Sequence, residues 1–317
     1  MSPLEFRHSS SRRGGRYAVP LLTIVTLGMF CAASAWLGAT TPRDVPDTSG
    51  YTNFDFQFPA LLAQARTLGY PLYLELHERL TGSHRWVCWG HTFLFAAAAL
   101  FFSASLPVSP HSRLAVLIGL MGTNIYWLYA DTIATDTPAA AMGLVAIGFT
   151  VRFADRRTLG IAAGVCLSAS AAWLIRPAML AIVPASILIS IVATRESGRR
   201  EFISRIALLG GLLCAPVLLF CLLRLATVGK FGIVSFGGYN LIGVVGQFPS
   251  ADSAPLASDE AQQIRERVRA LKVDDPPALG ELPPMNYTRL ELNYDRTIWH
   301  WYVPAAQNVV GDDPAKI

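Results

Sequence analysis

Two aspartates, Asp44 and Asp47, stand three residues apart in a polar stretch, with Pro46 between them. Proline here and the glycine at position 50 favour a turn, and on a turn both carboxylates can face one pocket. A carboxylate within hydrogen-bond reach of a hydroxyl group can act as a general base. Aspartates beside proline and glycine are also ordinary turn formers, so the spacing allows a catalytic and a structural interpretation.

A second pair of aspartates, Asp131 and Asp136, lies in a short turn between two apolar segments. Ionisable groups at membrane depth are costly, and for that reason they often have a function. Asp136 precedes Thr137 and Pro138, a pattern typical of a helix N-cap followed by proline in the first turn. We therefore interpret Asp136 as a structural cap and leave a functional role open for Asp131.

Two arginines, Arg176 and Arg224, stand at the ends of apolar segments, apart from the other basic clusters. A guanidinium group can hold a phosphate through two parallel hydrogen bonds, as a lipid-linked phosphate donor would require. The alternative is that each side chain extends to the membrane interface only to keep its charge in water.

The histidines and cysteines do not have the spacing of a metal site. The five cysteines are scattered in or beside apolar segments without a C-x-x-C pair, which argues against both a zinc site and a disulfide framework. We predict no protein-held metal centre from these residue types.

The composition is that of a membrane protein. Of 317 residues, 52% are hydrophobic and only 15% are charged, which is more apolar than a soluble core of this length requires. The net charge is +4, but the basic residues occur in short runs between apolar segments, so they indicate membrane topology and not a nucleic-acid partner. We expect an all-α membrane protein.

Seven segments approach the roughly 20 apolar residues that a membrane-spanning helix needs. They are Tyr17–Ala39, Trp86–Leu106, Leu114–Tyr129, Pro138–Phe153, Leu159–Ile175, Pro177–Ala193 and Ile206–Ala226. Basic residues precede the first segment as in a signal peptide, but its length favours an uncleaved anchor.

Basic residues in the short connecting loops predict the orientation, because such loops stay in the cytoplasm. With the N-terminus inside, every arginine cluster falls on the cytoplasmic side: Arg113, Arg152, Arg156, Arg157, Arg195, Arg199, Arg200 and Arg205. The loops with the aspartates then lie outside the cytoplasm. We therefore expect a multi-pass protein of the plasma (inner) membrane.

The chain divides into three predicted parts: a cytoplasmic basic N-terminus (1–16), a seven-span module (17–226) with a long first outer loop (40–85), and an outer tail (227–317). The first outer loop contains two predicted amphipathic helices, Pro59–Gly69 and Leu72–Leu80. The tail contains a helix over Glu260–Leu271, capped by Ser258, and a short helical stretch over Tyr287–Trp301.

The order of these features resembles the GT-C superfamily of multi-spanning glycosyltransferases, which includes protein mannosyltransferases and the lipid A aminoarabinose transferase. One span is followed by a long outer loop with Asp44, Asp47 and Tyr51. The segments that follow are Arg66 with Gly69-Tyr70-Pro71-Leu72-Tyr73, the turn from Tyr129 to Pro138, Leu174-Ile175-Arg176-Pro177, and Gly238-Tyr239-Asn240-Leu241. The similarity covers about the first 250 residues and rests on the order of these segments.

This resemblance implies an inverting transferase that moves a sugar from a polyprenyl-phosphate-linked donor to a glycan, lipid or protein acceptor at the outer face of the membrane. It implies Asp47 as the catalytic base, with Asp44 as the second candidate, Arg176 or Arg224 on the donor phosphate, and Asp131 on the acceptor or a cation. Relatives often have adjacent acidic residues, whereas Val45 and Pro46 separate them here, which leaves the base and any divalent cation open. Relatives also continue with further spans and an outer domain, so the resemblance implies a minimal or a truncated form.

The alternative is a transporter or flippase of a lipid-linked or amphipathic substrate. Such proteins usually have charged groups near the membrane midplane and paired broken helices. Here the predicted spans are almost free of charge at their centres, which favours chemistry at the interface. A third hypothesis, a non-enzymatic assembly subunit, explains the spans but neither the acidic loop nor the outer arginines.

Overall fold

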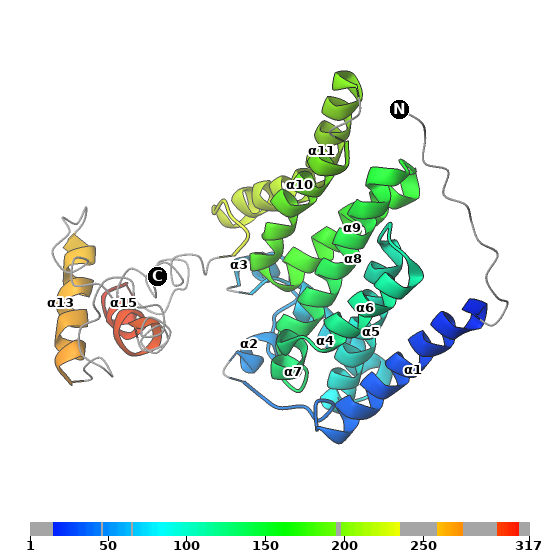
Figure 1. Ribbon diagram of the computed structural model, residues 1–317. Helices are drawn as coiled ribbons and strands as arrows, with labels where there is room; N and C mark the ends of the chain where they lie inside the picture. The colour runs from blue at the N-terminus through cyan, green and yellow to red at the C-terminus, as the bar shows by residue number, and fades with distance from the viewer. Residues whose placement is uncertain are drawn as a thin grey trace. The chain divides into compact units, whose positions relative to one another are not determined.

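The computed structural model describes residues 15–45, 47–64, 66–194, 198–234, 259–274 and 297–310. These residues form helices and no sheet; the one β-bridge among them joins Arg43 to Thr132. The chain divides into two compact units (Figure 1), Met1–Phe54 with Thr67–Leu223 as unit 1, and Asp55–Arg66 with Arg224–Ile317 as unit 2.

Four helices are long and apolar enough to cross a membrane. They are α1 (Gly15–Trp36), α5 (Val87–Ser105), α8 (Asp136–Asp155) and α11 (Arg199–Val228). Two predicted spans correspond to shorter apolar helices, α9 (Leu159–Ile175) and α10 (Ile182–Thr194), the latter preceded by a 3-10 turn, η2 (Pro177–Ala181). The prediction of an all-α protein is confirmed, with four helices that could cross a membrane by their length and composition.

The predicted span Leu114–Tyr129 is not one helix. It is divided into α6 (Pro110–Met121) and α7 (Asn124–Tyr129). The Gly122 N–H donates to the carbonyls of Ile118 and Gly119, which ends the first helix. Glycine is a poor residue for a helix interior, so Gly122 was the signal in the sequence for this break.

Helices α8 and α9 form the central hairpin of unit 1 and lie side by side in Figure 1. Glycine permits this close packing, because a Cβ added to Gly164 would come within 2.6 Å of the Phe149 ring. The core beside it contains Phe153, Val165 and Ala172, all buried. One end of the hairpin is the polar connection between α8 and α9. The other end is where α8 begins and α9 ends.

The first outer loop contains α2 (Thr48–Thr52), α3 (Ala60–Ala63) and α4 (Gly69–Thr81). The predicted helix Pro59–Gly69 is wrong beyond one turn, because Gln64 is in an extended conformation that ends α3. The predicted helix Leu72–Leu80 is confirmed and extends further. α4 begins directly against the last turn of α9, where Gly69 faces the Leu174 backbone.

In unit 2, helices α13 (Asp259–Asp274) and α15 (Val303–Val310) pack together with the π-helical turn η4 (Thr297–Tyr302). Val268, Trp301 and Ala305 form their buried core. The predicted helix over Glu260–Leu271 is confirmed, while its predicted cap Ser258 and the part of the last predicted helix before residue 297 lie outside the described residues.

Candidate active site at the acidic loop

The acidic loop is held against the turn that joins α7 to α8 by backbone hydrogen bonds. The Arg43 N–H donates to the Asp131 carbonyl at 2.6 Å, and the Ile133 N–H donates to the Arg43 carbonyl at 3.0 Å. These two bonds form the parallel bridge between Arg43 and Thr132. Two segments far apart in the sequence are therefore neighbours at the same end of unit 1.

The side chains of Arg43 and Asp131 reinforce this contact. Arg43 Nε donates to Asp131 Oδ2 at 2.9 Å and its Nη2 donates to Oδ1 at 3.3 Å, a two-pronged arrangement. The hydrogen bond and the charge of Asp131 raise the pKa of Arg43. The Arg43 side chain is 61% exposed, so water screens the ion pair and the pair adds little to the stability of the fold.

Thr48 provides the second attachment of the loop. Its buried hydroxyl donates to the Ile133 carbonyl at 3.1 Å and accepts a hydrogen bond from the Val45 N–H at 2.8 Å. The residues from Arg43 to Thr48, which include both candidate bases, are thus fixed at each end to the same turn.

The two candidate bases differ in their surroundings. Asp44 is exposed, whereas Asp47 is half-buried at the start of α2. The Asp47 carboxylate makes no capping hydrogen bond to α2, although the Asp47 carbonyl accepts one from the Gly50 N–H at 3.1 Å. A half-buried aspartate is better suited to proton transfer than one surrounded by water.

Asp136 and Arg176 form an ion pair at the same end of the α8–α9 hairpin. Arg176 Nη1 donates to Asp136 Oδ1 at 2.5 Å and to Thr135 Oγ1 at 3.2 Å. The predicted N-cap role of Asp136 is wrong by one residue, since Thr135 precedes the helix and Asp136 is its first residue. The Arg176 side chain as a whole is 42% exposed to solvent.

Aromatic side chains form a buried cluster next to this pair. The rings of Tyr51 and Tyr70 meet edge to face with centroids 5.0 Å apart, and Tyr73 stacks on Tyr70 at 5.9 Å. Burial raises the pKa of Tyr70 and of Tyr73, so both phenols are neutral. The Tyr70 hydroxyl faces His91 Nε2 at 3.4 Å. In the sequence, His91 is a single histidine inside an apolar run, which is weak evidence for a site.

Arg224 belongs to unit 2 and is only 1% exposed. Its Nε donates to the Leu62 carbonyl at 2.8 Å and its Nη1 to the Gly232 carbonyl at 2.6 Å. Four of the five sequence-predicted site residues, Asp44, Asp47, Asp131 and Arg176, belong to unit 1.

Among the residues that the structure describes, no group of three or more histidine, cysteine or acidic side chains could hold a metal ion. This result covers only the described residues, so the absence of a metal centre in the whole protein stays a prediction. No protein-family model, curated protein or solved structure matches this chain. A functional interpretation therefore depends on the geometry of the acidic loop and its neighbours.

Proposed function

We propose that this protein is a membrane glycosyltransferase that moves a sugar from a polyprenyl-phosphate-linked donor to a hydroxyl-bearing acceptor, with inversion. The acceptor oxygen attacks the anomeric carbon while Asp47 takes its proton. The bond between that carbon and the donor phosphate oxygen breaks, and the polyprenyl phosphate leaves with the electron pair. The leaving group is already a phosphate, so the protein mainly has to position the substrates and stabilise negative charge.

One observation carries the proposal: the acidic loop is attached to the turn that precedes α8. The backbone bonds between Arg43 and Asp131 and the Thr48–Ile133 bond attach it there. The candidate base and the Arg176–Asp136 pair consequently belong to the same end of the α8–α9 hairpin. A transferase needs a base and a phosphate-binding cation within one substrate length of each other.

Within this proposal we assign separate roles to the polar residues. Asp47 is preferred over Asp44 as the base because it is half-buried. Arg176 is preferred over Arg224 as the phosphate ligand, because the Arg224 guanidinium is buried and already donates to two carbonyls. Asp131 positions the loop through Arg43, and a role toward the acceptor or a cation would be additional to that contact.

The proposed topology has seven crossings, with the N-terminus in the cytoplasm of the cell and the acidic loop outside. The four long apolar helices support it directly, and α9 and α10 are short crossings that neighbouring helices would shield. The crossing over residues 114–129 would be made by α6 and α7 together; Gly122 and Asn124 at their break are exposed, so in this topology the break would have to face water or polar headgroups and not hydrocarbon. The polyprenyl tail would lie between spans, with its phosphate at the outer surface.

The test is a transfer assay on the full chain in nanodiscs with polyprenyl phosphates that carry different single hexoses. Release of free polyprenyl phosphate that depends on an added acceptor fraction from the cell envelope is the expected result. Lipid analysis of cells with and without the gene should in parallel show a missing glycoconjugate and accumulated carrier-linked sugar. An unchanged envelope together with no release from any donor would overturn the proposal.

A further inference from the structure

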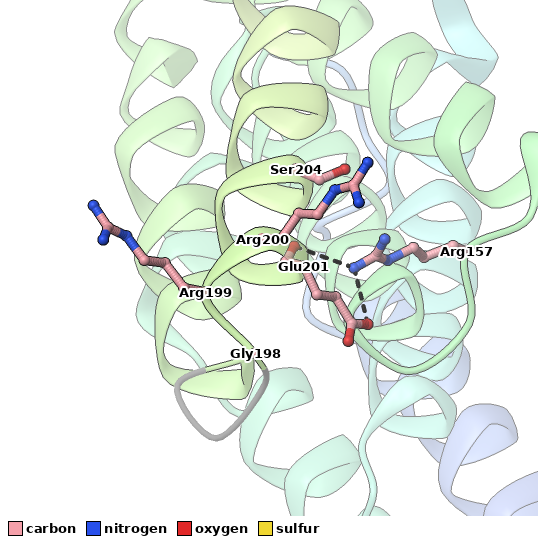
Figure 2. A pocket seen from close by; sticks show the side chains of 6 residues that line it. All are labelled: Arg157, Gly198, Arg199, Arg200, Glu201 and Ser204. Atoms are coloured by element: carbon pink, nitrogen blue, oxygen red, sulfur yellow. Dashed lines mark hydrogen bonds and ion pairs between the residues drawn. The ribbon is translucent and has the colours of Figure 1, made fainter.

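A basic depression lies at the end of the α8–α9 hairpin opposite to the acidic loop. Figure 2 shows the six residues that line it: Arg157, Gly198, Arg199, Arg200, Glu201 and Ser204. It is open to the surface, and its volume is about 520 Å³. Arg157 comes from the connection between α8 and α9, and the other residues come from the start of α11 and the residue before it.

The depression carries an excess of positive charge. Its one acidic residue, Glu201, is held by two arginines: Arg157 Nη2 is 3.2 Å from Glu201 Oε1, and Arg205 Nη2 is 2.5 Å from the same atom. Arg199 and Arg200 are exposed and form no ion pair with any residue that the structure describes. Figure 2 shows both side chains extending away from Glu201, with Arg200 alongside Ser204.

The position of the depression along the helices corresponds to the surface of a bilayer. It lies at the first turn of α11, the longest of the four candidate spans, and next to the last turn of α8. The 20 residues of α8 separate it from the acidic loop by about 30 Å, which is the thickness of the hydrocarbon layer. Groups at this level face the phosphates of the lipid headgroups.

Apolar side chains continue from the depression along the same helices. Ile203, on α11, is 54% exposed, and Leu208, one and a half turns further along, is 48% exposed. Leu159, at the start of α9, is 87% exposed. Two exposed guanidinium groups and a hydroxyl therefore lie directly beside apolar surface, an arrangement that matches a molecule with an anionic head and hydrocarbon chains.

We propose that this depression binds the headgroup of an anionic phospholipid, with Arg199, Arg200 and Ser204 on the phosphodiester and the acyl chains along α11. Arginine binds phosphate through two parallel hydrogen bonds, which suits a group at the edge of the lipid layer. A choline headgroup would bring its own positive charge against these arginines, so selectivity for a net negative lipid follows. This site is distinct from the proposed transfer site and does not depend on it.

The experiment measures lipid retention by the full chain purified in detergent. Phosphatidylglycerol and phosphatidylcholine with identical acyl chains are titrated separately, and bound lipid is counted by native mass spectrometry. Phosphatidylglycerol should bind at least about fivefold more tightly than phosphatidylcholine. The variant R199Q/R200Q should weaken phosphatidylglycerol binding by about 25-fold, at about fivefold per arginine near a lipid surface. Its thermal unfolding should be unchanged, because both side chains are exposed.

The matched control is R156Q/R267Q, which removes the same charge from two exposed arginines that do not line the depression. This variant should retain lipid as the wild type does. An equal loss of binding in both variants would mean that only total charge matters and would overturn the site. Inorganic phosphate is the third probe: if it displaces phosphatidylglycerol completely at millimolar concentration, the depression is a free-anion site and the lipid assignment is wrong.

Discussion

Arg43 and Asp131 are 88 positions apart in the sequence and are joined through their backbones as well as their side chains. Of the two kinds of contact, the backbone bonds define where the loop lies and the ion pair defines which residues face each other. Together with the Thr48–Ile133 hydrogen bond, this attachment places Asp44 and Asp47 next to the start of α8, although a long stretch of chain separates them from it.

The ion pair can be tested by removing one partner. In D131N the carboxylate charge is lost, so we expect faster amide hydrogen exchange at Arg43 and Ile133, whose N–H groups bond across the contact. R43Q should have the same effect, and the reversed pair R43D/D131R should recover part of the protection. Exchange rates that stay at the wild-type value in both single variants would show that the backbone bonds alone hold the loop.

The role of Asp47 predicts an unequal effect of two similar substitutions. D47N should lower the transfer rate by at least about 100-fold, the lower end of what general-base catalysis contributes. D44N removes the same charge from an exposed position three residues away and should cost far less. Both variants should insert into membranes normally. If D44N is the more damaging change, the base has been assigned to the wrong aspartate.

Arg176 should affect the donor more than the acceptor. R176A removes the partly exposed guanidinium, so the KM for the polyprenyl-phosphate donor should rise while the KM for the acceptor stays constant. R176K retains the charge but not the two-pronged geometry and should have an intermediate effect. D136N is the control for the loss of the ion pair; a donor KM equal to that of R176A would indicate that the pair acts only by supporting the fold.

Gly69 should tolerate no larger residue. A Cβ at this position would lie 2.5 Å from the Leu174 carbonyl carbon and 2.7 Å from the Ile175 nitrogen, and neither backbone atom can move without shifting α9. G69A should therefore lower the free energy of unfolding by roughly 1–3 kcal/mol. G210A is the matched control, because nothing lies within 4 Å of the Cβ added there. Equal stability of the two variants in detergent would contradict the close approach of α4 and α9.

The buried tyrosines predict how stability depends on alkaline pH. Tyr70 and Tyr73 have pKa values raised by burial above the ordinary 10.0, so they stay protonated when tyrosines of the unfolded chain ionise. Their contribution is complete below pH 10 and is lost as the pH rises further, because the unfolded state then releases protons that the folded state keeps. The midpoint of thermal unfolding should fall less steeply above pH 10 in Y70F/Y73F than in the wild type.

Several helices could be predicted closely from hydrophobic runs. Leu159–Ile175 was predicted with the observed bounds, and Trp86–Leu106 differs from α5 by one residue at each end. The runs alone did not predict the break at Gly122, because the apolar sequence resumes three residues later and only the glycine itself signals a break. They also could not predict that α11 begins at Arg199, since its first turn is polar and lies before the apolar run.

The sequence indicates candidate residues, whose roles stay predictions, but not the contacts that they make. The aspartates at positions 44, 47 and 131 were identified by their charge at the ends of apolar runs. Nothing local in the sequence indicates that Arg43 pairs with Asp131, or that Arg176 pairs with Asp136, because both contacts join different helices and loops. Pairings of this kind depend on how the elements pack and not on the pattern within any one of them.

Helix α8 has a charged side chain in its first turn, Asp136, and another in its last turn, Arg152. The 16 residues from one to the other span about 24 Å, and both charges seek water or polar headgroups. The helix consequently cannot slide along its axis to suit a thicker membrane, and longer acyl chains would have to become compressed around it. In the proposed transferase, bilayer thickness would therefore act on the position of the Asp136 end, where the transfer site is proposed.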